Sequence, residues 1–156
     1  RITAYITVLE ADRAEYSGPL VSIPGLEGLT PDIPEGMLYD LYEEGSLKLK
    51  DGRYVQRNWT ESFRQNRPVY MFVDPPPYAA KGRVEPYKTA AANPELLNAE
   101  FPADVYILDL GLRVMVNDTG GGLGPQGPLD IYVGEGLASE RAFGVYFSQV
   151  FVLVGE

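Results

Sequence analysis

Four oxygen-bearing side chains in the last third of the chain could bind a metal ion or take part in acid–base chemistry. Asp109, Asn117, Asp118 and Asp130 carry the carboxylate and amide oxygens that Ca²⁺ prefers. Their spacing does not match an EF-hand loop, and solvated loop acids are the competing interpretation. The metal candidates are Asp109, Asp118 and Asp130, and we expect any bound cation in the segment 117–130.

Carboxylate pairs could also cleave a glycosidic bond, because glycoside hydrolases place two of them about 5–10 Å apart across a cleft. Glu43 with Glu44 and Asp109 with Asp130 are the available pairs, although Glu43-Glu44 precedes a glycine and is typical of an exposed turn. Histidine and cysteine are absent, which excludes imidazole bases, thiol nucleophiles, disulfides and their zinc sites. No motif organises the remaining groups, so we predict no catalytic residues, no cofactor and no enzymatic activity.

Aromatic and basic residues in the middle of the chain suggest a contact surface. The lone Trp59 is close to Arg57 and Arg64, a combination that could form a sugar-stacking or cation–π surface, with a core or interface anchor as the competing interpretation. Tyr78 completes Pro-Pro-Pro-Tyr, a form that WW modules bind, although such prolines can simply stiffen a loop. The predicted interface residues are Arg57, Trp59, Arg64, Tyr78, Phe147 and Phe151.

Short runs of β-branched and aromatic residues, separated by Gly, Pro and Asp, must position these side chains and favour a β-protein. Residues 2–9 alternate as in a half-buried strand. Residues 37–42 and 67–73 predict further strands, and residues 47–59 predict a hairpin that turns at Asp51-Gly52. The segment 78–102 is irregular, with one short helix expected near residues 93–97.

The last third of the chain shows the clearest alternation. Between residues 105 and 116 every even position is apolar, which predicts one long strand with a packed face. Residues 129–133 predict another strand. The final run, 141–154, is apolar on both faces and includes Phe147 and Phe151, so we expect it to cross a core or to be covered by another subunit. Eight or so antiparallel strands, long Pro/Gly-rich loops and one short helix predict an all-β single jelly-roll sandwich over residues 1–156.

Length, composition and charge limit the possible functions. The 156 residues are 45% hydrophobic and 22% charged, which suits one globular domain. No apolar run is long enough to cross a membrane, and a net charge of −9 argues against general nucleic-acid binding. The net charge is −7 over residues 1–47, +5 over 48–88 and −7 over 89–156. Complementary blocks of this kind could pair copies of the chain as a homo-oligomer.

In size, β-content and loop character the chain resembles a small single-jelly-roll coat protein of an icosahedral virus. The use of arginine and proline would suit a phage of a thermophile. The resemblance implies a capsid subunit in the virion that pairs with itself and with a second capsid protein. A small-molecule-binding or cyclase-like β-barrel and a carbohydrate-binding β-sandwich are the alternatives, and a cytoplasmic soluble protein is the alternative location.

Overall fold

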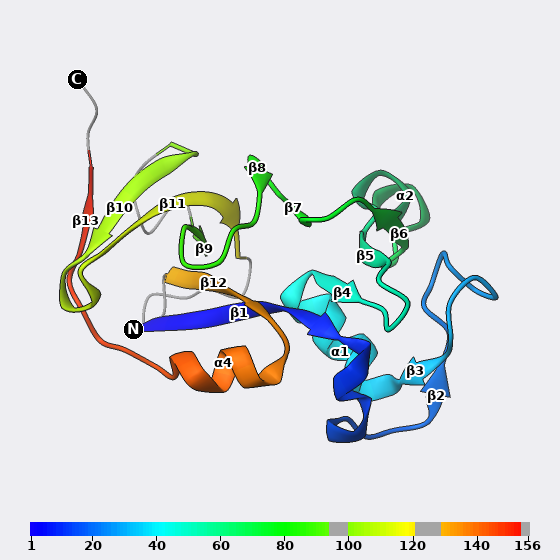
Figure 1. The fold of residues 1–156 in the computed structure, drawn as a ribbon. Coiled ribbons are helices and arrows are strands. Elements are labelled where there is room, and N and C mark those ends of the chain that lie inside the picture. Colours follow the sequence, from blue (N-terminus) through cyan, green and yellow to red (C-terminus); the bar gives the residue numbers. More distant parts are fainter. Residues whose placement is uncertain (94–99, 121–128, 154–156) are drawn as a thin grey trace. The chain divides into compact units, whose positions relative to one another are not determined.

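The computed structural model describes residues 1–93, 100–120 and 129–153 (Figure 1). Its contacts group into two compact units. Unit 1 comprises Arg1–Tyr5, Tyr78–Gly134 and Ala138–Glu156, and unit 2 comprises Ile6–Pro77 and Glu135–Leu137. Strand β1 (Ile2–Leu9) contributes its first half to unit 1 and its second half to unit 2. Each unit is described by itself below.

Unit 1 is built on a mixed sheet with the strand order β13-β10-β11-β9-β12-β1. Its strands are β9 (Thr89–Ala92), β10 (Ala103–Ile107), β11 (Leu112–Thr119), β12 (Leu129–Glu135) and β13 (Val150–Val152). Strands β9 and β11 run parallel, whereas β10 with β11, β10 with β13 and β12 with β9 are antiparallel. The unit also contains the short hairpin β7 (Tyr78–Ala79) and β8 (Gly82–Arg83), the 3-10 helix η2 (Leu108–Leu110), and α4 (Leu137–Phe143), which begins at the end of unit 2.

Unit 2 combines a smaller set of strands with two helices. Strands β4 (Ser46–Lys48), β5 (Tyr54–Arg57) and β6 (Tyr70–Val73) follow β1 in that order, with β1 and β4 parallel and the other pairs antiparallel. The remaining elements are η1 (Glu10–Glu15), the pair β2 (Leu20–Val21) and β3 (Ile33–Pro34), α1 (Glu35–Glu44) and α2 (Trp59–Gln65). Its apolar core contains Val8, Ile23, Leu26, Ile33, Met37, Leu41, Leu47, Leu49, Val55 and Tyr70.

Several local predictions are confirmed. The first strand spans residues 2–9 as expected. The hairpin of residues 47–59 forms from β4 and β5, and Gly52 in its turn has φ +93°, a conformation that glycine adopts without a steric penalty. Strands also occur within the predicted segments 67–73 and 129–133. The short helix expected near residues 93–97 falls almost entirely outside the described residues.

Three local predictions are wrong. The run 141–154 is not one strand, because residues 141–143 end helix α4 and only Val150–Val152 form β13. Residues 37–42 form part of helix α1 instead of a strand, because Met37 and Leu41 are one helical turn apart and bury the same face, and Gly45 ends the helix in the left-handed conformation. The segment 105–116 is a hairpin and not one strand, because Gly111 reverses the chain after η2. The buried side is therefore made by Val105, Ile107, Val114 and Val116, and the even-numbered apolar face does not exist.

The fold class is confirmed only in its coarse form. The protein is mostly β, with a large mixed sheet and a few short helices. A jelly-roll sandwich of antiparallel strands is not what the described residues show, because β1 pairs with β4 and β9 pairs with β11 in parallel. In the described part of the chain, no helix is long and apolar enough to cross a membrane.

Candidate active site

Asp118 and Asp130 project from the same face of the unit 1 sheet, on the two strands that flank β9. Asp118 in β11 and Asp130 in β12 are both register partners of Ala91 in β9. Directly paired residues lie on the same face of a sheet, and two strand spacings place the two Cα atoms about 9.5 Å apart. Ala91 extends only a methyl group between the two carboxylates. The two acids therefore flank Ala91 on one face of the sheet, where Ala91 is buried in a cluster with Tyr5, Val84 and Tyr132.

Asp118, Ala91 and Asp130 lie side by side across three strands and are here called the acidic row. A β-bulge places Asp118 in this row. Val116 and Asp118 pair with consecutive residues of β9, so Asn117 is the extra residue of β11. The Asn117 side chain is buried, and its Nδ2 donates a 3.0 Å hydrogen bond to the backbone oxygen of Arg83. Without the bulge the amide of Asn117 would pair with Ala91, and the carboxylate would point to the opposite face.

Asp130 is held by a hydroxyl group from β1. Thr3 Oγ1 donates a 2.8 Å hydrogen bond to Asp130 Oδ1. Burial raises the pKa of Asp130 above its ordinary value, and the bond from Thr3, which favours the ionised form, opposes that rise. The carboxyl group therefore has a fixed orientation and keeps its proton to a higher pH than a solvated aspartate.

Asp118 is held by backbone donors. Its Oδ1 accepts hydrogen bonds from the backbone N–H of Ala80 at 3.2 Å and from that of Thr119 at 2.9 Å. Burial raises the pKa of Asp118 as well, and these two bonds oppose the rise. Unlike Asp130, it is stabilised in its ionised form by two fixed donors.

Aromatic rings pack beside the acidic row. Tyr5 and Tyr132 lie two residues along their strands from Thr3 and Asp130, so they share the same face of the sheet. Their ring centroids are 5.2 Å apart at an interplanar angle of 62°, and both rings are buried in a cluster that includes Ala91. These buried rings lie on the same face as Asp130, whose carboxyl group is itself desolvated by burial.

The row is better suited to proton transfer than to metal binding. A carboxyl group with a raised pKa keeps its proton to a higher pH than a solvated aspartate and can give that proton to a leaving group. Within residues 1–93, 100–120 and 129–153, no three acidic, histidine or cysteine side chains lie close enough to hold a metal ion. Asp109 is placed in η2, exposed, with its backbone N–H bonded to Ser148 Oγ at 2.9 Å.

The other predicted carboxylate pair lies in unit 2. Glu43 and Glu44 form the end of α1 and not an exposed turn. Glu44 Oε2 accepts a 3.1 Å hydrogen bond from the backbone N–H of Ile6. A hydrogen bond to Glu43 raises the pKa of Tyr39. Glu44 therefore bonds to the backbone of β1 and Glu43 bonds to Tyr39, so each acid has a hydrogen-bond partner within the fold.

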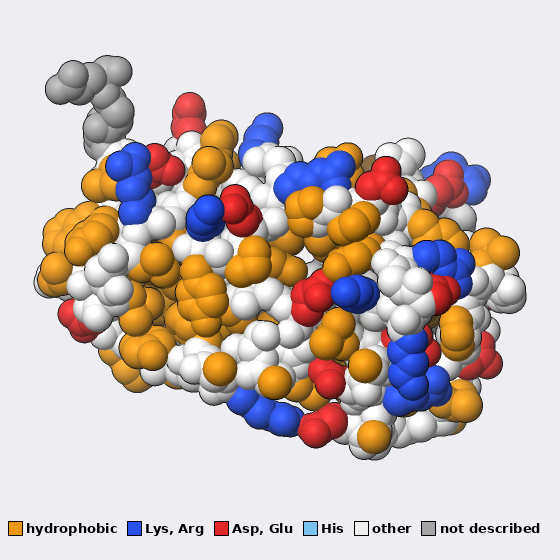
Figure 2. Space-filling model, viewed as in Figure 1, with side chains coloured by type: hydrophobic (Ala, Val, Ile, Leu, Met, Phe, Trp, Pro, Cys, Tyr) orange, Lys and Arg blue, Asp and Glu red, His pale blue; other side chains and the backbone are white. Residues whose placement is uncertain are grey.

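The predicted interface residues separate into two groups. In unit 2, Arg57 stacks on the ring of Trp59 at 4.7 Å, whereas Arg64 forms a 2.6 Å ion pair with Glu61. In unit 1, Tyr78 is in β7, and its ring lies 3.9 Å from the guanidinium of Arg83. Also in unit 1, Phe147 and Phe151 are exposed near β13, where Figure 2 shows hydrophobic side chains gathered on the surface. No contact in this structure tests their role as interface residues.

Sequence reasoning found the two acids but missed the residues around them. Thr3, Tyr5, Ala91 and Tyr132 were not candidates. The signal for Thr3 and Tyr5 was present in the alternation of residues 2–9, which places them together on the face opposite Ile2. Ala91 and Tyr132 gave no comparable signal, because their role depends on the order of strands in the sheet.

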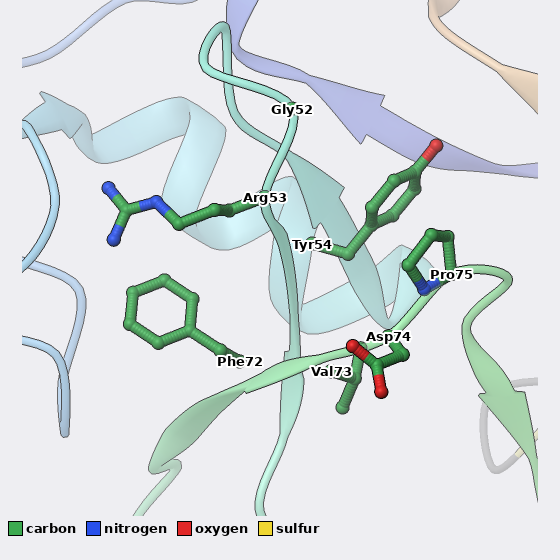
Figure 3. Close-up of a pocket in the computed structure, with 7 residues that line it drawn as sticks. All are labelled: Gly52, Arg53, Tyr54, Phe72, Val73, Asp74 and Pro75. Carbon is green, nitrogen blue, oxygen red and sulfur yellow. The ribbon is translucent and has the colours of Figure 1, made fainter.

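Unit 2 contains a hollow of about 380 Å³ between β5 and the end of β6 (Figure 3). Arg53 lies over the ring of Phe72 at 4.6 Å on one side of it. The hydroxyl of Tyr54 donates a hydrogen bond to Glu135, and burial together with this bond raises the pKa of Tyr54 to about 12. The lining residues are Gly52, Arg53, Tyr54, Phe72, Val73, Asp74 and Pro75. They belong to unit 2, whereas the acidic row belongs to unit 1.

Comparison with known proteins relates the fold to murein-cleaving enzymes. No protein-family model matches the chain, and no curated protein does. The structure is similar to that of MltA from E. coli with bound chitohexaose, with a TM-score of 0.63 and 10% identity over 97% of this chain and 70% of that one. It is also similar to a membrane-bound lytic murein transglycosylase from Agrobacterium tumefaciens, with a TM-score of 0.59 and 14% identity over 96% of this chain and 71% of that one.

These similarities overturn the functional predictions made from the sequence. The structures that share the fold are lytic transglycosylases and not coat proteins, so the predicted capsid subunit of a thermophilic phage and its place in the virion are wrong. They match neither the small-molecule-binding or cyclase-like barrel nor the carbohydrate-binding sandwich. The prediction that the chain is not an enzyme is also contradicted. It rested on the absence of histidine and cysteine, whereas a buried aspartate requires neither.

Proposed function

We propose that this chain cleaves glycan strands of the murein type by transglycosylation, with Asp130 as the acid and then the base. The observation that carries the proposal is the desolvated carboxyl group of Asp130, oriented by Thr3 on a sheet whose fold is that of lytic transglycosylases. One of the similar structures holds chitohexaose, a β-linked oligomer of amino sugars. That ligand supports a glycan as the substrate class.

The reaction uses one proton-carrying group twice. Protonated Asp130 donates its proton to the oxygen that links two sugars, and the bond between that oxygen and the anomeric carbon breaks. The leaving sugar departs with a new hydroxyl group. Ionised Asp130 then takes the proton of an acceptor hydroxyl, whose oxygen bonds to the anomeric carbon. Asp130 returns to its starting state, and no water is consumed.

Asp118 has a different part in this proposal. Its two backbone donors favour the ionised form, although burial raises its pKa overall. When ionised, Asp118 supplies negative charge on the same face as Asp130. Cleavage of a glycosidic bond passes through a transition state with positive charge on the sugar ring. An ionised Asp118, held by its backbone donors on the other side of Ala91, would stabilise that charge without accepting a proton.

The test is the mass of the products. Purified protein is incubated with murein sacculi and, separately, with chitohexaose, and the soluble fragments are analysed by mass spectrometry. We expect fragments that have not gained water. Asp130→Asn should lower the rate by about a hundredfold or more, whereas Asp109→Asn, an exposed aspartate of the same unit, should leave it unchanged. Hydrolysed products, or an Asp130→Asn variant with full activity, would refute the mechanism.

A further inference from the structure

Arg57 in β5 of unit 2 lies among three aromatic rings. Its guanidinium carbon is 4.6 Å from the ring centroid of Tyr42, 4.7 Å from that of Trp59 and 5.7 Å from that of Tyr70. These rings belong to α1, α2 and β6, so three elements hold one cation. Trp59 is 70% exposed and Tyr42 is 50% exposed, so the cluster of Arg57, Tyr42, Trp59 and Tyr70, here called the arginine cage, opens to solvent.

The cation of the arginine cage has no counter-ion in the described part of the chain. No carboxylate there lies within 4.0 Å of the Arg57 guanidinium, and its buried Nε has no hydrogen-bond acceptor. Other arginines of unit 2 differ, since Arg53 pairs with Asp51 at 2.8 Å and Arg64 pairs with Glu61 at 2.6 Å. A guanidinium fixed between rings but without an anion is prepared to receive one.

The acidic groups on the neighbouring helices have other donors. On α2, Glu61 also accepts from Gln65 Nε2 at 3.1 Å. On α1, Asp40 accepts from the hydroxyl of Tyr16, and Glu43 and Glu44 have the contacts described above. Burial raises the pKa of Tyr70, and both the charge of Arg57 and its hydrogen bond to the Tyr70 hydroxyl oppose this rise. The partner of Arg57 inside the cage is thus a phenol and not a carboxylate.

We propose that the arginine cage binds a carboxylate of the substrate, namely one on the short peptides that glycan strands of murein carry. This assignment rests on the proposed function, because it takes murein as the substrate. The rings of Tyr42 and Trp59 hold the plane of the guanidinium, and its parallel N–H donors match the two oxygens of a carboxylate. The cage would therefore distinguish glycan that carries peptides from bare glycan such as chitohexaose.

The experiment measures binding and not cleavage. Full-length protein with Asp130→Asn, which preserves the sacculi, is sedimented with intact sacculi and with sacculi whose peptides an amidase has removed. We expect Arg57→Met to weaken binding to intact sacculi about tenfold or more, as loss of a charge-assisted bidentate contact predicts. Binding to stripped sacculi should be weak and insensitive to the substitution. Arg64→Met, in α2 of the same unit, is the matched control and should bind as the parent does.

A second variant separates binding from structure. Arg57→Lys keeps a cation among the rings but lacks the planar fork, so it should lose binding as Arg57→Met does while its thermal unfolding stays close to that of the parent. Parental binding by Arg57→Lys would show that the planar fork is not needed and would overturn the proposed bidentate contact. Equal binding of the parent to intact and stripped sacculi would overturn it as well, as would an equal loss in Arg64→Met.

Another carboxylate source is a second copy of this acidic chain. If Arg57→Met changes the solution mass measured by light scattering and leaves sacculus binding unchanged, the anion belongs to a partner copy and the proposal is wrong. A failure of cleavage in the mass-spectrometric test would refute the proposed function separately, because sedimentation does not depend on catalysis.

Discussion

Thr3 and Asp130 are joined by a 2.8 Å hydrogen bond although 127 positions separate them in the chain. The bond links the first strand to β12 and fixes one oxygen of the proposed catalytic carboxyl group. Its effect on the pKa of Asp130 is opposite to that of burial. The hydroxyl of Thr3 therefore influences both the position of Asp130 and the pH range in which Asp130 is protonated.

Replacing Thr3 by valine should move the pH profile of cleavage. The bond from Thr3 favours the ionised carboxylate, so its loss raises the pKa of Asp130 further. Because the acid must be protonated to act, kcat/KM should fall at a higher pH than in the parent. A loss of orientation should also lower kcat several-fold. Thr3→Ser keeps the hydroxyl and should retain the parental profile. An unchanged alkaline limb in Thr3→Val would show that this bond does not affect the acid.

Asp130→Asn should stabilise the fold by about 1 kcal/mol at a pH above the folded pKa of Asp130, where the parent carries a desolvated charge at this position. A carboxyl group with a raised pKa in the folded state gives stability that is fully present below the unfolded value, 3.8, and is lost as the pH rises through the folded value. Urea unfolding of the parent and the variant at about pH 4 and about pH 7 checks this. The difference between the two proteins should grow with pH, and a difference independent of pH would contradict the expectation.

Ala91→Val should abolish most of the cleavage activity without destroying the fold. The larger side chain would add two carbon atoms between Asp118 and Asp130, the register partners of Ala91 on either side. Ala90→Val is a matched control, since Ala90 is also buried in β9 but projects to the opposite face. Both substitutions overpack the sheet and should cost about 1–3 kcal/mol. Fragment release from sacculi measures the activity of both variants. Equal activity would show that substrate does not occupy the space between Asp118 and Asp130.

Gly25→Ala should strongly destabilise unit 2. Gly25 has φ +90°, and an added Cβ would lie 2.6 Å from Val69 Cγ1 and 2.7 Å from the backbone oxygen of Tyr70. Backbone strain of about 1–2 kcal/mol and this collision add together, so we expect a loss of about 3 kcal/mol. Gly28→Ala has a positive φ of +74° but no atom within 4 Å, and should show the strain alone. Similar urea midpoints for the two variants would exclude the collision.

The sequence predicted features that depend on neighbouring residues. Strand β1 and the β4–β5 hairpin follow from alternation and from the Asp51-Gly52 turn. Helix α1 was mistaken for a strand, since six residues of mixed apolar character contain too little of a helical repeat to be distinguished. Strand β9 was missed because its sequence, Thr followed by three Ala, has low strand propensity and is determined by burial between β11 and β12.

The candidate site was only half predictable for the same reason. Asp118 and Asp130 attract attention in the sequence as acids near a glycine-rich segment, but their residue types fit a metal ligand as well as a proton donor. What distinguishes the two roles is the common partner Ala91, the bulge at Asn117 and the hydroxyl of Thr3. All three depend on strand pairing between distant segments, which local patterns do not contain.

The division of β1 between the two units has a consequence for the order of events during synthesis. Almost all of unit 2 is the single segment Ile6–Pro77. In contrast, Arg1–Tyr5 belong to unit 1, together with Tyr78–Gly134 and Ala138–Glu156. During synthesis residues 1–5 emerge before β12, so they cannot pair with it until residue 129 and its neighbours have left the ribosome. Unit 2 should therefore become compact first. The pairing of residues 1–5 with β12, which completes the sheet of unit 1, should be the slow late step.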